Sequence, residues 1–186
     1  KGMVPLLNMW HDIKQHIPAA KLKVIGGFYK FRDEAGPDEQ EHDWNRLYAN
    51  YADVDDISFT GIITQKEISD ILEQASYMIY PAAFPETFGI SSLEALAHNV
   101  PILTCQFGAL EETAIDNACY KIKYAIEPNN LYPNINATYQ REQFIKMVVD
   151  AYHNPYLHQQ KMYACNQVKG LCEWSTVALQ WKQHFF

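Results

Sequence analysis

The stretch PAAFPETFGISSLEALAHNVP, at positions 81–101, predicts a loop that leads into a helix. Pro81, Pro85 and Gly89 favour a loop, because proline fixes φ and glycine adopts conformations closed to other residues. Apolar residues then recur at helical spacing, at Ile90, Leu93, Leu96 and Ala97. Asn99 occupies the position where a left-handed residue commonly ends a helix, and Pro101 prevents its continuation.

A short, mostly apolar run, SYMIY at residues 76–80, precedes the loop and predicts a buried strand. A strand, a loop and a helix in this order place the helix N-terminus above the carboxyl end of the strand, where open α/β sheets bind ligands. The first N–H groups of a helix have no partner within it, so this end favours an anion.

Two glutamates lie in this stretch, Glu86 in the loop and Glu94 in the helix. We expect both to border one cleft, with Glu86 at its mouth and Glu94 deeper along the helix. Carboxylates there are good acceptors for sugar hydroxyls, because each can take more than one O–H bond. The alternative is that both are ordinary solvated charges.

The pattern P-x-x-x-P-E-T-F-G-I-S-S-L-E-A-L-A-x-N-x-P strongly resembles the donor-site motif of the retaining glycosyltransferases of family 4, which have the two-domain GT-B fold. The resemblance implies that Glu86 is the catalytic glutamate, which meets the donor sugar, and that Glu94 holds the ribose hydroxyls of the nucleotide. It also implies contacts with the sugar and the diphosphate from Thr87, Phe88, Gly89 and Ile90. Asn99 stands where the family usually has glycine, and both accept a left-handed backbone.

The start of the chain, Lys1-Gly2-Met3, resembles the start of the family's donor domain. There a lysine, together with an arginine a few residues earlier, pairs with the diphosphate. Lys1 would be that lysine, and the arginine is not in this sequence, so donor binding should be weakened. The alternative is that Lys1 is only a frayed terminal residue. We expect residues 1–186 to be a single donor-binding domain cut from a longer protein, without its N-terminal acceptor domain.

Three further segments resemble parts of the same family. IGG at residues 25–27 and FTGII at residues 59–63 resemble its nucleotide-facing turns, although any such sheet needs glycines at its turns. QFGALEE at residues 106–112 resembles a loop usually written with two glycines, and since Phe107 replaces the first we assign it no role. The tail from Trp174 to Trp181 resembles the family's closing helix.

Periodicity and chain breakers predict alternating strands and helices along the whole chain. Strands are expected at residues 21–28, 57–61, 76–80, 102–105 and 120–124. Helices are expected at residues 3–17, 41–51, 65–75, 90–98 and 109–114, and in three segments after residue 138, the first two separated by Asn154-Pro155. This order predicts an α/β, Rossmann-like three-layer α/β/α domain with a parallel sheet of five to six strands and C-terminal helices. By resemblance it is one half of a GT-B fold.

The composition excludes several classes of protein. The formal net charge of −7 argues against binding to nucleic acid or to an anionic membrane, which would need a basic surface. Four cysteines without a C-x-x-C pair indicate free thiols of a reducing compartment, hence a cytoplasmic location. The seven histidines form no metal-binding pattern, so we expect no metal site. A peripheral membrane contact of the longer protein stays open.

The resemblance implies transfer of a sugar from a nucleotide-sugar donor to an acceptor hydroxyl, with retention at the anomeric carbon and without a metal or other cofactor. The acceptor, a sugar, lipid or glycan, would bind the missing domain, so this chain alone should bind nucleotide weakly and transfer nothing. The alternatives are a GT-B phosphorylase or epimerase, and a non-catalytic nucleotide-binding or interaction domain. A hydrolase with paired carboxylates is disfavoured by the alternating strands and helices.

Overall fold

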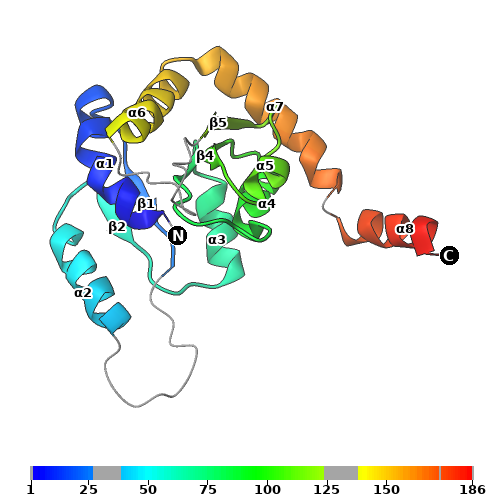
Figure 1. Ribbon diagram of the computed structural model, residues 1–186, viewed down its shortest axis with the longest axis horizontal. Coiled ribbons are helices and arrows are strands. Elements are labelled where there is room, and N and C mark those ends of the chain that lie inside the picture. The colour runs from blue at the N-terminus through cyan, green and yellow to red at the C-terminus, as the bar shows by residue number, and fades with distance from the viewer. Residues whose placement is uncertain (1, 27–38, 124–137, 172, 186) are drawn as a thin grey trace, which may run out of the picture. The chain divides into compact units, whose positions relative to one another are not determined.

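The computed structural model describes residues 2–26, 39–123, 138–171 and 173–185 (Figure 1). By its contacts the chain forms two compact units, and we describe each by itself. The smaller unit is Pro18–Ile71, and the larger unit joins Lys1–Ile17 to Leu72–Phe186.

The smaller unit contains a two-stranded parallel sheet. Its strands are β1 (Leu22–Val24) and β2 (Ile57–Phe59), paired so that Leu22 lies opposite Ile57. The helix α2 (Glu39–Tyr51) connects the two strands, and α3 (Gln65–Leu72) follows β2. This is the βαβ order that the sequence predicted.

The start of α3 is a capping box, as Thr64 and Glu67 predicted. The Thr64 N–H donates to Oε2 of Glu67 at 2.8 Å, and the Glu67 N–H donates to the Thr64 hydroxyl oxygen at 3.3 Å. These hydrogen bonds, led by the one from the Thr64 backbone, lower the pKa of the Glu67 carboxyl.

The larger unit is built on a three-stranded parallel sheet in the order β3–β4–β5. Its strands are β3 (Met78–Tyr80), β4 (Ile102–Gln106) and β5 (Cys119–Lys123). Its helices are α1 (Met3–His16), α4 (Ile90–Ala97), α5 (Leu110–Thr113), α6 (Thr138–Tyr152), α7 (Pro155–Leu171) and α8 (Trp174–Phe185). Figure 1 shows α1 and α6 on one side of the sheet and α4 and α5 on the other, which gives three layers.

The core of the larger unit lies where α1, α4, α5 and α6 meet the sheet. The central strand β4 is buried from Ile102 to Cys105, as expected for a strand covered on both faces. The fully buried large side chains from the helices are Met9, Ile13, Leu96, Leu110 and Phe144. On α1 the buried residues include Leu6, Leu7, Trp10 and Ile13, which belong to the predicted apolar stripe.

The five expected strands and the α/β class are confirmed, but the described strands pair in two sheets of two and three strands rather than one of five or six. The first strand is also shorter than predicted. Gly26 adopts a φ of 103° and forms an antiparallel bridge with Gly61, so the extended pairing of β1 ends at Val24. The rest of that predicted strand lies outside the described residues.

The helix α4 buries Ser92, Ala95 and Leu96, whereas Ile90 is 65% exposed. Of the predicted apolar stripe, Leu96 is fully buried and Leu93 and Ala97 are half-buried, so Ile90 is the member that departs from the buried face. α4 contacts both β4 and α7, and small side chains allow the backbones to approach closely.

The end of α4 is a Schellman motif centred on Asn99, which has a φ of 61°. The Val100 N–H donates to the Ala95 carbonyl and the Asn99 N–H to the Leu96 carbonyl, both at 3.0 Å. The predicted left-handed residue is thereby confirmed, and it turns the chain from α4 into β4.

We predict that Asn99→Ala lowers the free energy of unfolding by about 1 kcal/mol, because alanine resists a left-handed backbone more than asparagine does. Asn99→Gly should leave stability equal or higher, since glycine adopts this conformation without strain. Urea denaturation of the three proteins measures both effects. Equal stability of the Ala and Gly variants would show that the backbone conformation is not the reason for Asn99.

The helix α7 contacts Tyr77, which directly precedes β3, through the aromatic ring of His158. The ring centroids of His158 and Tyr77 are 4.4 Å apart, and the Tyr77 hydroxyl donates to the Ala151 carbonyl at 2.9 Å. Nδ1 of His158 is buried and has no hydrogen-bond partner among the described residues. Burial lowers the pKa of His158, because a charged imidazolium would lose its hydration there.

Since the folded protein favours neutral His158, the unfolded chain binds this proton more readily. We therefore predict that His158 contributes stability above the ordinary histidine pKa of about 6.5, and that this contribution is lost as the pH falls through the lower pKa of the folded state. Urea denaturation at pH 8 and pH 5 should show a smaller pH dependence in His158→Gln than in the wild type. The same reduction in His153→Gln, which replaces an exposed histidine, would contradict an origin in the buried ring.

Candidate functional site

The loop between β3 and α4 ends at Gly89, which caps the helix with a φ of 82°. Gly89 is buried, and a Cβ on it would lie 3.1 Å from Cδ2 of Leu110. Both the left-handed backbone and the close approach of α5 require glycine here. α4 thus begins at the end of the loop that leaves the carboxyl end of β3, the position at which open α/β sheets bind ligands.

The backbone of Glu86 is held by the turn that follows β4. The Ala109 N–H donates to the Glu86 carbonyl at 2.9 Å, and Glu86 and Gly108 form a parallel β-bridge. Gly108 has a φ of 59°, and a Cβ on it would lie 2.8 Å from the carbonyl oxygen and 2.9 Å from the nitrogen of Glu86. This turn belongs to the segment to which the sequence assigned no role, and it positions the predicted catalytic residue.

The Glu86 side chain is only 8% exposed, and its carboxylate accepts a hydrogen bond from the Tyr80 hydroxyl. Burial, followed by this hydrogen bond, raises the pKa of Tyr80. The sequence did not single out Tyr80. A tyrosine at the end of a buried strand was the available signal, since a buried hydroxyl usually has a partner.

The other predicted site residues of this stretch differ in exposure. Thr87, Phe88 and Ile90 are exposed around the loop, and Phe88 and Ile90 are 54% and 65% exposed. Glu94 is half-buried in α4, and its carbonyl accepts hydrogen bonds from the backbone and Nδ1 of His98. Of the two glutamates, Glu86 is the more buried. The expected cleft, with Glu86 at its mouth and Glu94 deeper along the helix, stays a prediction.

Lys1 lies outside the described residues, but its neighbour Gly2 is placed against the same loop. Gly2 caps α1 with a φ of 109°, and a Cβ on it would lie 2.4 Å from the Pro81 carbonyl oxygen. Glycine at position 2 therefore allows the start of α1 to contact the first residue after β3.

In the smaller unit, the two glycine turns that resemble nucleotide-facing turns meet each other. The Gly26 N–H donates to the Gly61 carbonyl at 3.2 Å, and the Thr60 N–H donates to the Val24 carbonyl at 3.0 Å. Gly26 and Gly61 have φ values of 103° and 65°, and this left-handed backbone accounts for both glycines structurally. Gly27 lies outside the described residues.

A groove of about 730 Å³ lies at β5, α6 and the start of α7. Its described lining includes none of the predicted site residues, and consists mainly of tyrosines, lysines and apolar side chains, among them Tyr120, Lys121, Lys123, Tyr139, Lys146 and Met147. No group of three potential metal-ligating side chains occurs in the ranges that the structure covers. Within those ranges, no helix combines the length and apolar character needed to cross a bilayer.

The larger unit therefore has a glycine-bounded loop at the carboxyl end of a parallel sheet, where α/β domains bind ligands. A family model described as "Glycosyl transferases group 1" matches residues 1–133. The chain belongs to this family, which confirms the resemblance predicted from the motif. A search of curated proteins finds no match.

Solved glycosyltransferase structures share this fold at low sequence identity. The pneumococcal O-GlcNAc transferase GtfA, solved with UDP and GlcNAc, aligns with 98% of this chain and 32% of its own, with a TM-score of 0.71 and 14% identity. Sucrose-phosphate synthase from Thermosynechococcus elongatus aligns over 94% of this chain and 40% of its own, with a TM-score of 0.68 and 19% identity. Anabaena HepE, solved with UDP and glucose, aligns with 100% of this chain and 45% of its own, with a TM-score of 0.66 and 12% identity. The chain thus spans less than half the length of these proteins.

We predict that Gly108→Ala lowers the free energy of unfolding by about 2 kcal/mol or more, because the added Cβ collides with the Glu86 backbone at a left-handed position. Gly170→Ala is the matched control. Gly170 lies in α7 with nothing within 4 Å of an added Cβ, so this change should stabilise by about 0.5–1 kcal/mol. Urea denaturation measures both variants, and a neutral Gly108→Ala would contradict the close contact.

Proposed function

We propose that this chain is the donor-binding half of a retaining glycosyltransferase, which moves a sugar from a nucleotide-sugar to an acceptor hydroxyl. The observation that carries this proposal is the placement of Glu86, a buried carboxylate held in the loop immediately before the N-terminus of α4. A carboxylate and a helix N-terminus side by side suit a ligand that joins hydroxyl groups to a diphosphate.

Each predicted residue has a role in donor binding. Glu86 accepts hydroxyls of the donor sugar, while the backbone amides from Thr87 to Ile90 face the diphosphate. Glu94, one turn into α4, accepts the two ribose hydroxyls. Lys1 adds a positive charge for the diphosphate.

The proposed reaction depends on stabilising the charge of the leaving diphosphate and on positioning the sugar and the acceptor. The bond from the anomeric carbon to the diphosphate breaks, and negative charge develops on the leaving diphosphate. The amides at the start of α4 and the Lys1 ammonium stabilise that charge, which is electrostatic stabilisation of the transition state without a metal. Glu86 orients the sugar, and a separate acceptor domain of the longer protein binds the acceptor. The acceptor hydroxyl oxygen forms the new bond to the anomeric carbon, with retention, while its proton passes to the leaving diphosphate. This chain alone therefore binds donor and transfers nothing.

The acceptor in this proposal is a sugar, lipid or glycan. The proposed location of the protein is the cytoplasm. The buried thiols of Cys105, Cys119 and Cys165 suit a reducing compartment. Two of the similar structures were solved with UDP, which makes UDP the first nucleotide to test.

Calorimetric titration of the chain with UDP, GDP and ADP tests the proposal. We expect one nucleotide to bind, and Glu94→Ala to weaken it by about tenfold or more, because hydrogen bonds to a charged group contribute about 1.5–3 kcal/mol.

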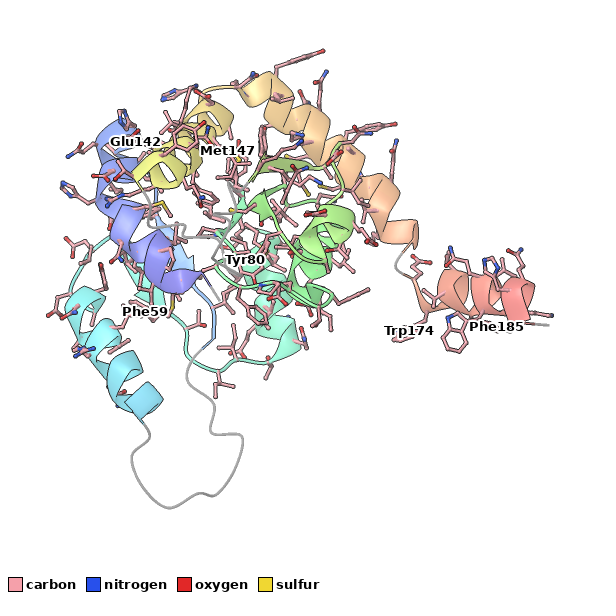
Figure 2. The ribbon with its side chains drawn as sticks, viewed as in Figure 1. Phe59, Tyr80, Glu142, Met147, Trp174 and Phe185 are labelled. Atoms are coloured by element: carbon pink, nitrogen blue, oxygen red, sulfur yellow. The ribbon has the colours of Figure 1, made fainter. Side chains whose placement is uncertain are left out.

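The matched control is Glu142→Ala, which removes an exposed glutamate on α6 (Figure 2). It should bind the nucleotide as the wild type does. Absence of binding by all three nucleotides, or equal weakening by both substitutions, would contradict the proposed donor site.

A further inference from the structure

Tyr80 is the last residue of β3, and its backbone is held by the neighbouring strand β4. It pairs with Thr104 of the central strand β4, and the Thr104 hydroxyl donates to the Tyr80 carbonyl at 2.8 Å. Thr104 is fully buried, and Tyr80 itself is 8% exposed and lies inside the larger unit (Figure 2). The backbone of Tyr80 therefore has a fixed position, and its buried ring has little freedom to move.

The Tyr80 hydroxyl reaches the Glu86 carboxylate, six residues further along the chain. The backbone of Glu86 is fixed separately, by the Ala109 N–H and by the close packing of Gly108. Two separate parts of the fold thus hold Glu86. The turn after β4 sets where its main chain lies, and β3 sets where its carboxylate points.

We propose that Tyr80 is a positioning residue for the donor sugar, because its hydroxyl holds the Glu86 carboxylate in the orientation that accepts the sugar hydroxyls. This inference rests on the proposed function. A carboxylate offers about four lone-pair sites, so it accepts a bond from Tyr80 and further bonds from a sugar. Fixing the side chain before the donor arrives removes the entropy cost of ordering it on binding.

A purely structural role of the same hydrogen bond makes a different prediction. A bond that only fastens the loop would change stability and would affect the nucleotide and the nucleotide-sugar alike. A bond that orients Glu86 affects the part of the affinity that the sugar contributes. We define the sugar gain as the Kd of a nucleoside diphosphate divided by the Kd of its sugar conjugate.

The experiment measures the sugar gain by calorimetry for the pairs UDP and UDP-glucose, UDP and UDP-GlcNAc, GDP and GDP-mannose, and ADP and ADP-glucose. We expect the wild type to show a gain for at least one pair. Tyr80→Phe keeps the buried ring and removes the hydroxyl, and it should reduce that gain by about three- to tenfold with the nucleotide Kd nearly unchanged. In a Glu86→Ala background, which removes the acceptor of the Tyr80 hydroxyl, Tyr80→Phe should cause no further reduction.

The matched control is Tyr77→Phe, which removes a tyrosine hydroxyl that donates to the Ala151 carbonyl on α6. It should leave the sugar gain unchanged. If Tyr80→Phe does not fold, Thr104→Val replaces it, because this variant releases the Tyr80 carbonyl and should reduce the gain by a smaller factor.

The outcomes separate the inference from the proposed function. A wild-type sugar gain that persists in Tyr80→Phe, or in Thr104→Val if that variant must be used, overturns the role of Tyr80. Nucleotide binding without any wild-type sugar gain also overturns it, and leaves the nucleotide site intact. Failure of the wild type to bind any of these nucleotides overturns the proposed function, and the inference with it.

Discussion

The buried carboxylate of Glu86 is the constraint on which the functional end of the larger unit depends. A carboxylate that is 8% exposed needs hydrogen-bond partners, since burial of an unsatisfied charge costs several kcal/mol. Tyr80 supplies one partner from β3, and the turn after β4 holds the Glu86 backbone through Gly108 and Ala109. Because both contacts come from neighbouring strands of one sheet, the register of β3 and β4 determines the position of the loop.

The helix that follows, α4, is bounded at each end by a residue with a left-handed backbone conformation. Gly89 and Asn99 bracket α4 with φ values of 82° and 61°, and they fix where the helix begins and where the chain returns to the sheet. Between them, Ser92, Ala95 and Leu96 face inward. Ile90, in the first turn of α4, and Phe88, in the loop before it, are exposed and form part of the rim of the proposed donor site.

Much of this could be predicted from the sequence. Alternating apolar runs and breakers gave the order of strands and helices, and the motif gave the family. The local signals were accurate where short-range geometry decides the outcome, as at the capping box of Thr64 and Glu67 and at the left-handed Asn99. Burial was less predictable. Spacing alone did not show that α4 buries Ser92 rather than Ile90, because the choice depends on which surfaces of α7 and β4 it meets.

The sequence by itself determined the α/β class, the loop before α4 and the membership of the glycosyltransferase family, because these follow from chain order and from residues near one another. Only the tertiary structure decided that Glu86 is the buried glutamate, that Tyr80 holds its carboxylate, and that Gly108 fits against its backbone. Those contacts join β3 to the turn after β4. Packing between separate strands sets the direction of a side chain and the close approach of two backbones, and it has no local pattern in the sequence.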